Sequence, residues 1–457
     1  MAELLADQGY RITGSDVKES ANTERLRSLG IAVAIGHDAA NVGDADVVVY
    51  SSAVRADNPE LRRAEAAKIP VIGRAEMLAE LMRLKDGIAV AGSHGKTTTT
   101  SLVAHVLDAA GLDPTAVVGG RVLAAGRAPS TTRRGAGSLL VAEADESDGS
   151  FLRLAPVIAV VTNIDPEHLD YHGSYEALQD AFAAFCNRVP FWGAAVLCVD
   201  HPGVQGILPR INRRMIRYGT SSQADWIASG IGRDAQGLTF TVRHQGRRLG
   251  RVRLRLAGQH NALNALAALA VAHEVEVPFR VAADALESFL GIERRFEDKG
   301  TAAGVRVIDD YGHHPAEIEA TLAAAREIHG GRLVVAFQPH RYTRTRDLWD
   351  EFTRCFNRAD VLVLTEIYAA SEDKLPGVEA SLLAEAIRAH GHRAVFFEPD
   401  LDAALERLVR EVRAGDLVVT LGAGSIASLG ASLVARLADA GFAQRAEGER
   451  RPEGGPA

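Results

Sequence analysis

The chain has 457 residues, of which 47% are hydrophobic, with 51 lysines and arginines against 59 aspartates and glutamates and a formal net charge of -8. This composition is typical of a globular protein of two to four domains and excludes disordered, collagen-like and coiled-coil chains. The mild acidity argues against nucleic acid as a partner, because phosphate neutralisation favours an excess of basic residues.

The sequence also argues against export and against a membrane partner. The three cysteines, Cys186, Cys198 and Cys355, have no CxxC spacing that would favour a disulfide framework or a zinc-thiolate site. No run reaches the roughly 18 uninterrupted apolar residues of a membrane helix, and the chain opens without a charged-then-apolar export signal. We therefore expect a soluble protein of the cytoplasm.

Short β-branched runs alternate with Ala/Leu-rich stretches of helical period, which predicts an α/β fold with mostly parallel sheets. The pattern divides the chain into three blocks, 1–85, 86–297 and 298–445. A charged, Gly/Pro-rich tail at 446–457 is expected to be disordered.

The first block is predicted to open in the middle of a βαβ unit. Residues 1–8 form a predicted helix that stops at Gly9, and residues 10–14 form the next strand. We therefore expect the leading strand and its glycine turn to be absent and the first residue to be a misplaced start. The predicted elements that follow are strands at 46–51 and 70–73 and a helix at 74–84.

The second and third blocks alternate strands and helices. The second has predicted strands at 88–92, 138–142 and 157–162, helices at 97–110 and after Ser174 and Gly258, and short strands like an antiparallel patch over about 213–257. The third has predicted strands at 304–311, 332–339, 360–367 and 415–424.

The strongest local motif is GSHGKTTTT, which lies between a predicted strand and a predicted helix. Its members are Gly92, Ser93, His94, Gly95, Lys96, Thr97 and Thr98. Glycines let backbone N–H groups face a phosphate, the helix N-terminus adds positive potential, and Lys96 and Thr97 can reach the outer phosphates and Mg2+. The G-x-x-G-K-T spacing is shorter than the common P-loop, but the context favours ATP binding over a plain helix-capping turn.

Two acidic segments follow strands of the second block, EADESD at 143–148 and TNIDPEHLDYH at 162–172. Loops that leave the carboxyl ends of neighbouring parallel strands converge on one crevice, so their carboxylates and imidazoles could hold Mg2+ beside the phosphates. Each segment taken alone is more often a solvated acidic loop. Their repetition at strand ends favours the metal site.

Three further segments have both a structural and a functional interpretation. His260, Asn261 and Asn264 either cap the helix that follows Gly258 or recognise adenine or a metal. Arg294 and Arg295 either hold phosphate or form surface ion pairs. Arg341 and Arg344 either present two guanidinium groups to one anionic group such as a carboxylate or form a solvated basic turn.

These motifs, together with DDYGHHP at 309–315 and FQPHRYTRT at 337–345, stand in an order that closely resembles the Mur ligases over residues 1–438. The resemblance implies three domains: a Rossmann-like UDP-sugar domain that here lacks its first strand, a central P-loop-type ATPase domain and a C-terminal Rossmann-like domain for the amino acid. Within the family, the chain is most similar to members that join L-alanine to UDP-N-acetylmuramate in peptidoglycan synthesis. The resemblance also implies that the protein uses ATP and Mg2+, forms an acyl-phosphate intermediate and is a monomer or weak homodimer.

The resemblance also assigns residues by matching motif. Lys96 and Thr97 would hold phosphates and Mg2+, and Glu143 and His168 would bind a further Mg2+. His260, Asn261, Arg294 or Arg295, and Asp310 would lie at the nucleotide, and Tyr311, His313, Arg341 and Arg344 would meet the alanine.

The chain departs from the family in one chemical detail. Several sister ligases hold a metal with a carbamylated lysine, but no lysine occurs between Thr97 and Asp298. Competing interpretations are a ligase of the same family that recycles murein tripeptide, a truncated nucleotide-binding relative without turnover, and a P-loop kinase or GTPase. The short loop and the missing NKxD motif disfavour the last of these.

Overall fold

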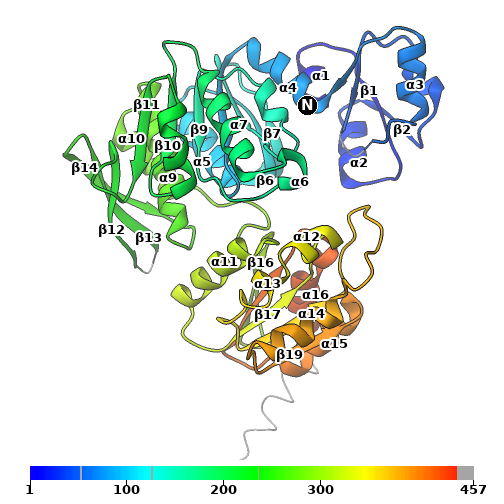
Figure 1. The fold of residues 1–457 in the computed structure, drawn as a ribbon, viewed down its shortest axis with the longest axis vertical. Helices are drawn as coiled ribbons and strands as arrows, with labels where there is room; N and C mark the ends of the chain where they lie inside the picture. The colour runs from blue at the N-terminus through cyan, green and yellow to red at the C-terminus, as the bar shows by residue number, and fades with distance from the viewer. Residues whose placement is uncertain (52–53, 125–126, 235, 440–457) are drawn as a thin grey trace, which may run out of the picture. The chain divides into compact units, whose positions relative to one another are not determined.

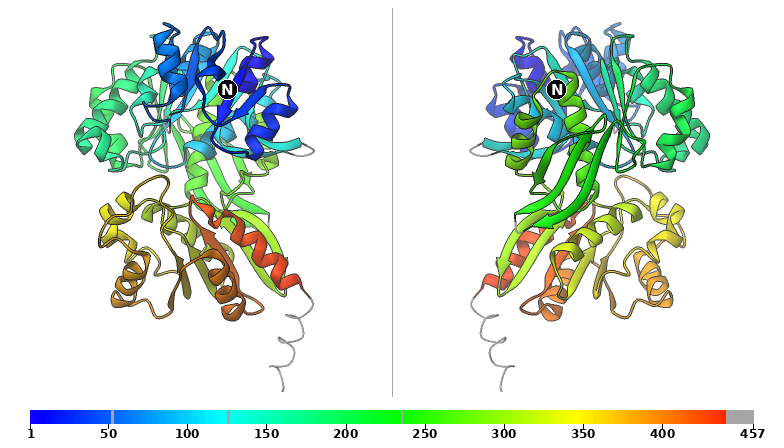
Figure 2. Two further views of the ribbon diagram at one scale, coloured as in Figure 1. Left: turned by 90° about the vertical axis from the view of Figure 1, so that its right-hand side faces the viewer. Right: turned by 90° about the vertical axis from the view of Figure 1, so that its left-hand side faces the viewer.

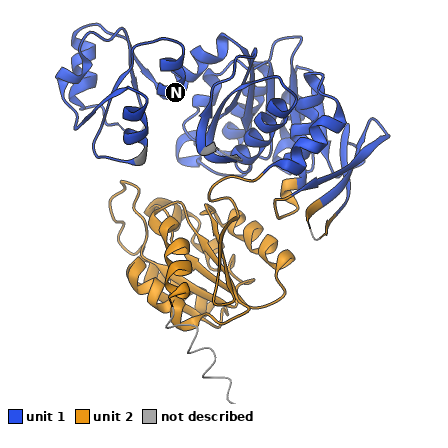
Figure 3. Ribbon diagram, turned by 180° about the vertical axis from the view of Figure 1, so that it is seen from behind, with its two compact units in different colours: residues 1–231, 239–254, 262–289 blue, residues 232–238, 255–261, 290–457 orange. Residues whose placement is uncertain are grey.

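A computed structural model describes residues 1–51, 54–124, 127–234 and 236–439. The prediction of a disordered tail at 446–457 lies outside this range. The described residues form two compact units, one within residues 1–231, 239–254 and 262–289 and the other within residues 232–238, 255–261 and 290–439 (Figure 3). Among them, no helix has the length and apolar character needed to cross a membrane.

The predicted α/β architecture is confirmed in both units (Figure 1). The first part of unit 1 contains α1 (Ala2–Asp7), β1 (Thr13–Asp16), α2 (Ala21–Ser28), β2 (Ala32–Ile35), η1 (Ala39–Val42), β3 (Val48–Tyr50), α3 (Pro59–Ala66), β4 (Val71–Gly73) and α4 (Arg74–Arg83).

The strands of this first part pair in parallel but form two separate sheets, β1 with β2 and β3 with β4. No strand among the described residues joins the two pairs. The strand predicted at 10–14 begins later in the structure. Gly9 ends the helical turn with a φ of +91°, and β1 starts at Thr13, where pairing with Ala32 begins.

The rest of unit 1 is built on a ten-stranded sheet with the order β14-β13-β12-β11-β10-β9-β5-β8-β6-β7. Its elements are β5 (Asp86–Ala91), α5 (Lys96–Ala109), β6 (Thr115–Ala124), β7 (Arg127–Arg133), β8 (Leu139–Glu143), η2 (Ser150–Arg153), β9 (Ile158–Val161), α6 (Leu169–His172), α7 (Tyr175–Asn187), β10 (Ala194–Cys198), α8 (Pro202–Ile207), η3 (Leu208–Arg210), β11 (Met215–Gly219), β12 (Trp226–Asp234), β13 (Gly237–His244), β14 (Arg247–Leu254), α9 (His260–Glu274) and α10 (Phe279–Ser288).

Helices cover both faces of this sheet (Figure 2). Apolar residues of α4 and α7 pack on one face against alternate residues of β5, β8 and β9, while α5 and α10 pack together on the other. Because β5 lies between β8 and β9 and runs parallel to both, the carboxyl ends of these three strands lie at one edge. The strands position the loops that carry the predicted site.

The predicted antiparallel patch at 213–257 is partly wrong. Strand β11 runs parallel to β10, and β12 begins parallel to β11. The connection through α8 and η3 returns the chain to the starting edge of the sheet, and such a crossover gives a parallel neighbour.

Unit 2 contains a six-stranded sheet with the order β15-β16-β20-β17-β18-β19, parallel except for β15. Its elements are β15 (Glu297–Ala302), β16 (Val305–Asp310), α11 (Pro315–Ile328), β17 (Leu333–Phe337), α12 (Tyr342–Asp347), α13 (Trp349–Phe352), β18 (Val361–Thr365), α14 (Ala380–Ala389), β19 (Val395–Glu398), α15 (Leu401–Glu411), β20 (Leu417–Leu421), η4 (Ser425–Ser428) and α16 (Leu429–Ala438). Helices α11 and α14 pack on one face and α15 and α16 on the other.

Candidate active site

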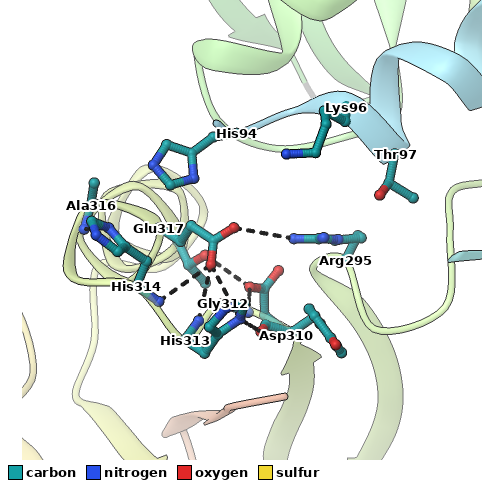
Figure 4. Close-up of polar contacts among 12 residues, drawn as sticks. His94, Lys96, Thr97, Arg295, Asp310, Gly312, His313, His314, Ala316 and Glu317 are labelled. Carbon is teal, nitrogen blue, oxygen red and sulfur yellow. Dashed lines mark hydrogen bonds and ion pairs between the residues drawn. The ribbon is translucent and has the colours of Figure 1, made fainter. Parts of the chain in front are cut away.

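The loop between β5 and α5 has the strand-loop-helix geometry of a phosphate cradle. Gly92 and Gly95 have φ angles of 135° and 82°, a region that favours glycine, and Gly95 is the N-cap of the 14-residue helix α5. Lys96 and Thr97 therefore stand at the first turn of this helix (Figure 4). Free N–H groups and the helix dipole at this point favour an anion.

The end of β9 fixes the backbone of this loop. The N–H of His94 donates to Asn163 Oδ1 at 2.7 Å, and the carbonyl of His94 accepts from Thr162 Oγ1 at 2.6 Å and Asn163 Nδ2 at 2.9 Å. The motif TNIDPEH thus holds the phosphate loop through its first two residues, a role that the sequence did not reveal.

The side chain of Lys96 is held within unit 1. Its Nζ donates to the carbonyls of Gly92 at 2.6 Å and Ser93 at 3.2 Å and to Glu146 Oε1 at 2.9 Å. Burial raises the pKa of Glu146 to about 7, and although burial by itself would lower the pKa of Lys96, the Glu146 carboxylate raises it. Lys96 therefore stays charged, and it must exchange a partner to reach a phosphate.

Oxygen donors that suit Mg2+ lie beside this lysine. Thr97 Oγ1 donates to Glu143 Oε1 at 3.1 Å, and Glu143 Oε2 accepts from the N–H of Gly119 at 2.9 Å. Mg2+ prefers carboxylate and hydroxyl oxygens, so Thr97 and Glu143 fit the ion.

His168 lies near two carboxylates of the same loops. Its ring nitrogen and one carboxylate oxygen each from Glu146 and Glu167 all lie within 4.8 Å of one another. The assignment of Glu143 and His168 to one Mg2+ stays a prediction. Glu146 and Glu167 were not among the predicted site residues, although they stand in the motifs EADESD and TNIDPEHLDYH.

The predicted adenine residues His260 and Asn261 are the first two residues of α9. They belong to unit 2, whereas the rest of the helix belongs to unit 1. Asn261 Nδ2 donates to the carbonyl of Ala257 at 2.6 Å, which is a local bond of the capping type. His260 lines a cavity of about 530 Å³ together with Gly258, Gln259, Ala320, Ala323, Ala324, Arg326, Glu327 and Arg358.

Arg294 and Arg295 have different surroundings within unit 2. Arg294 Nε forms an ion pair with Asp309 Oδ2 at 3.0 Å, and its Nη2 donates to the carbonyl of Gly422. Arg295 Nη1 lies 3.7 Å from Glu317 Oε1 (Figure 4). The guanidinium of Arg294 is thus used in a short internal ion pair, whereas that of Arg295 forms a longer one and lies 5.1 Å from the centre of the Tyr311 ring.

The predicted ribose residue Asp310 is buried and makes internal hydrogen bonds. Its carboxylate accepts from the N–H groups of Gly312 and Phe296 at 2.8 and 2.7 Å and from Thr321 Oγ1 at 3.1 Å. Burial raises the pKa of this carboxyl to about 6, against the opposing effect of Arg295. These contacts order the start of the DDYGHHP segment.

Unit 2 brings together several of the residues predicted to meet the amino acid. The rings of Tyr311 and His313 are 5.5 Å apart, the ring of His313 lies 5.6 Å from that of His340, and Arg344 Nη1 lies 3.2 Å from His340 Nδ1. Arg341 is the exposed N-cap of α12 with a φ of 71°. His340 was not among the predicted residues, although it directly precedes Arg341 in the motif.

Both histidines of this cluster are neutral at pH 7. Burial lowers the pKa of His313 to about 4, with Arg344 and Arg295 acting in the same direction and Glu317 opposing them. Burial, His313, Arg344 and Arg341 lower the pKa of His340 to about 3. Neutral imidazoles beside guanidinium groups leave the cluster with net positive charge, which suits a carboxylate.

We predict a loss of stability in acid that arises at His313. The unfolded side chain binds a proton below its ordinary pKa of 6.5, whereas the folded one does so only near 4, so stability present above pH 6.5 is lost as the pH falls towards 4. The loss should reach about 3 kcal/mol. Hydrogen exchange of peptides from β16 and α11 between pH 7 and 4.5 measures it. His340 contributes to the slope in the same direction, so His313→Gln should reduce the pH dependence without abolishing it, and an unchanged slope in this variant would contradict the assignment.

Sequence comparisons relate this chain to known proteins. Models of three Mur ligase domains match it: the Mur ligase family catalytic domain over 1–86, the Mur ligase middle domain over 90–272 and the Mur ligase glutamate ligase domain over 294–424. The chain is 58% identical over 443 residues to the UDP-N-acetylmuramate--L-alanine ligase of Sorangium cellulosum, covering 96% of this chain and 93% of that relative.

Solved structures give the same picture. The UDP-N-acetylmuramate-alanine ligase MurC from Thermotoga maritima has a TM-score of 0.80 and 28% identity, with 95% of each chain covered. A murein peptide ligase from Psychrobacter arcticus has a TM-score of 0.70 and 24% identity over 96% of each chain. The fold is shared with both, and the higher TM-score is with the alanine ligase.

Proposed function

Because the chain belongs to the Mur ligase family, we propose that it joins L-alanine to the lactyl carboxylate of UDP-N-acetylmuramate at the expense of ATP, giving ADP, phosphate and UDP-N-acetylmuramoyl-L-alanine for peptidoglycan synthesis. The observation that carries this proposal is the 58% identity over nearly the whole length to a relative with that name. The phosphate loop and the arginine-histidine cluster supply chemistry that fits both halves of the reaction.

The first half is transfer of the γ-phosphoryl group of ATP to the carboxylate, which converts a poor electrophile into an acyl phosphate. The backbone N–H groups of the loop after β5 hold the phosphates, and the Lys96 ammonium stabilises charge on the transferring group. Thr97 and Glu143 would hold Mg2+, with His168 at a further ion. When bound, Mg2+ supplies positive charge to the phosphates.

The second half is attack of the alanine amine on the acyl carbon, with phosphate as the leaving group. The guanidinium groups of Arg341 and Arg344 bind the alanine carboxylate, because a paired arginine site matches its geometry and charge. Tyr311 and the neutral imidazole of His313 orient the amine as hydrogen-bonding partners. Arg295 serves the nucleotide phosphates, since Arg294 is bound to Asp309.

The proposal includes three domains with boundaries 1–85, 86–297 and 298–445, for the UDP-sugar, ATP and the amino acid respectively. His260, Asn261 and Asp310 belong to the nucleotide site in this scheme. The chain acts as a monomer or weak homodimer, which sedimentation would measure.

The test is ADP release from Mg-ATP and UDP-N-acetylmuramate with and without L-alanine. We expect release that depends on alanine and a product whose mass equals UDP-N-acetylmuramoyl-L-alanine. Release with murein tripeptide instead of alanine would favour the recycling ligase. Nucleotide binding without any amine-dependent release would favour a relative without turnover.

A further inference from the structure

Ile164, in the loop after β9, has both of its backbone polar groups held by side chains. Its N–H donates to His201 Nδ1 at 3.3 Å, and its carbonyl accepts from Tyr175 Oη at 2.8 Å. Tyr175 is the first residue of α7, and His201 is the N-cap of α8. The loop that carries Asn163 and Asp165 is therefore supported by the starts of the two helices that follow it.

The contacts of His201 determine which of its ring nitrogens carries the proton. Nδ1 accepts from the N–H groups of Ile164 and Gly203 at 3.3 and 3.2 Å, so the proton of the neutral ring is on Nε2. Nε2 lies 3.2 Å from Asp165 Oδ1 and donates to it. This hydrogen bond is the main reason that the pKa of Asp165 lies below its usual value, so Asp165 stays ionised.

The start of α8 lies directly against this loop. A Cβ at Gly203 would collide with the carbonyl oxygen of Ile164 and with the hydroxyl of Tyr175, so no side chain fits between the helix and the loop. Close contact of the two backbones fixes the distance between His201 and Asp165. All of these residues belong to unit 1.

Asp165 carries this support to the phosphate loop. Its N–H donates to Ser93 Oγ at 2.8 Å, and its Oδ2 lies 3.4 Å from His94 Nε2, which also lies 3.1 Å from Glu167 Oε1. The side chains of His94, Asp165 and His201 are 19%, 30% and 25% exposed, so water and salt screen these contacts less than they screen contacts at the surface. Two carboxylates thus face one imidazole of the phosphate loop, and His201 fixes the position of one of them.

We propose that His201 is a positioning residue for ATP, which acts through Asp165 to hold His94 and the backbone N–H groups of the phosphate loop in the orientation that the nucleotide phosphates need. A site made of backbone N–H groups depends on where they point, and a supporting residue that fixes them stabilises the bound phosphates without touching them. The inference rests on the proposed function, since it requires that this loop binds ATP.

Two substitutions separate the roles of the two ring nitrogens. His201→Asn keeps an acceptor at the place of Nδ1 but is too short to reach Asp165, whereas His201→Gln keeps an N–H near the place of Nε2 and loses the acceptor. Calorimetric titration of the full chain with a non-hydrolysable ATP analogue and Mg2+ measures the Kd. We expect the Kd to rise about tenfold in His201→Asn and to change little in His201→Gln, which should instead melt at a lower temperature.

Gln205→Ala is the matched control in the same helix. Its side chain donates to the carbonyl of Val199 at 2.7 Å and supports α8 without a contact to Asp165 in the described part of the chain. We expect the Kd of the ATP analogue to stay unchanged in this variant.

A double-mutant cycle tests whether Asp165 carries the effect. Asp165→Ala should also raise the Kd about tenfold, and His201→Asn should add little in that background, because the contact it removes is already lost. In turnover assays the KM for ATP should rise with the Kd, while the KM for alanine should change little. A general loss of structure would raise both.

Three results would overturn the proposal: an unchanged Kd in His201→Asn, an equal rise in His201→Asn and His201→Gln, or full additivity of His201→Asn and Asp165→Ala. Thermal melting shows which variants are folded. If His201→Asn is not, a rise in His201→Gln as large as that in Asp165→Ala would overturn the proposal, and a rise in Asp165→Ala alone would support it.

Alanine-dependent ADP release by the unaltered protein is measured separately, so that the two proposals fail independently. Turnover together with an unchanged Kd in His201→Asn would remove the role of His201 and leave the proposed function. Weaker binding of the ATP analogue in His201→Asn, with no turnover by the unaltered protein, would do the reverse.

Discussion

Replacing Lys96 with methionine should lower kcat about 1000-fold while the chain stays folded. The ammonium stands at the start of α5, and phosphoryl transfer needs positive charge where negative charge develops. Glu146, whose pKa is already raised to about 7, then takes up a proton instead of remaining as a buried lone charge. The measurement is alanine-dependent ADP release under saturating substrates.

Lys85→Met is the control for loss of a lysine. Its Nζ donates to Thr115 Oγ1 and to the carbonyls of Gly135 and Gly137, so it supports the sheet and not the phosphate loop. We expect this variant to melt at a lower temperature with kcat little changed. If Lys96→Met kept kcat within tenfold of the unaltered protein, Lys96 would have no role in phosphoryl transfer.

Arg294→Ala should lower the free energy of unfolding by about 3–5 kcal/mol, because it leaves the carboxylate of Asp309 buried without its cation. The Asp309 side chain is 0% exposed, and burial already raises its pKa against the opposing contributions of Thr420 and Arg294. The variant also removes the bond to the carbonyl of Gly422, which joins β20 to the loop before β15. Chemical unfolding of the full chain measures the change.

The neighbouring Arg295→Ala separates stability from function. Its ion pair to Glu317 is long at 3.7 Å, so we expect a much smaller loss of stability and a higher KM for ATP. Asp309→Asn in the Arg294→Ala background should recover part of the lost stability, since it removes the unpaired charge. If Arg294→Ala kept full stability but bound ATP more weakly, Arg294 would be a nucleotide-binding residue and the stability prediction would be wrong.

Local signals were reliable where a short segment determines its own structure. The strand-loop-helix context of GSHGKTTTT predicted β5, the loop and α5, because glycine conformation, helix capping and apolar periodicity act within a few residues. The same holds for α7, whose N-cap Ser174 accepts from the N–H of Ala177 as its position suggested. Strand β15 was missed because its residues, EDKGTA, have no apolar alternation and pair only as an antiparallel edge.

The sequence by itself determined the α/β class, the phosphate loop and the resemblance to the Mur ligases, since these depend on local pattern and on the order of motifs. Only the tertiary structure decided which charges are paired. Lys96 meets Glu146 across 50 positions, and Arg294 meets Asp309 across 15 positions and the Gly422 carbonyl across 128. The energy of a charge depends on its partners and burial in space, and neither is encoded in the spacing of nearby residues.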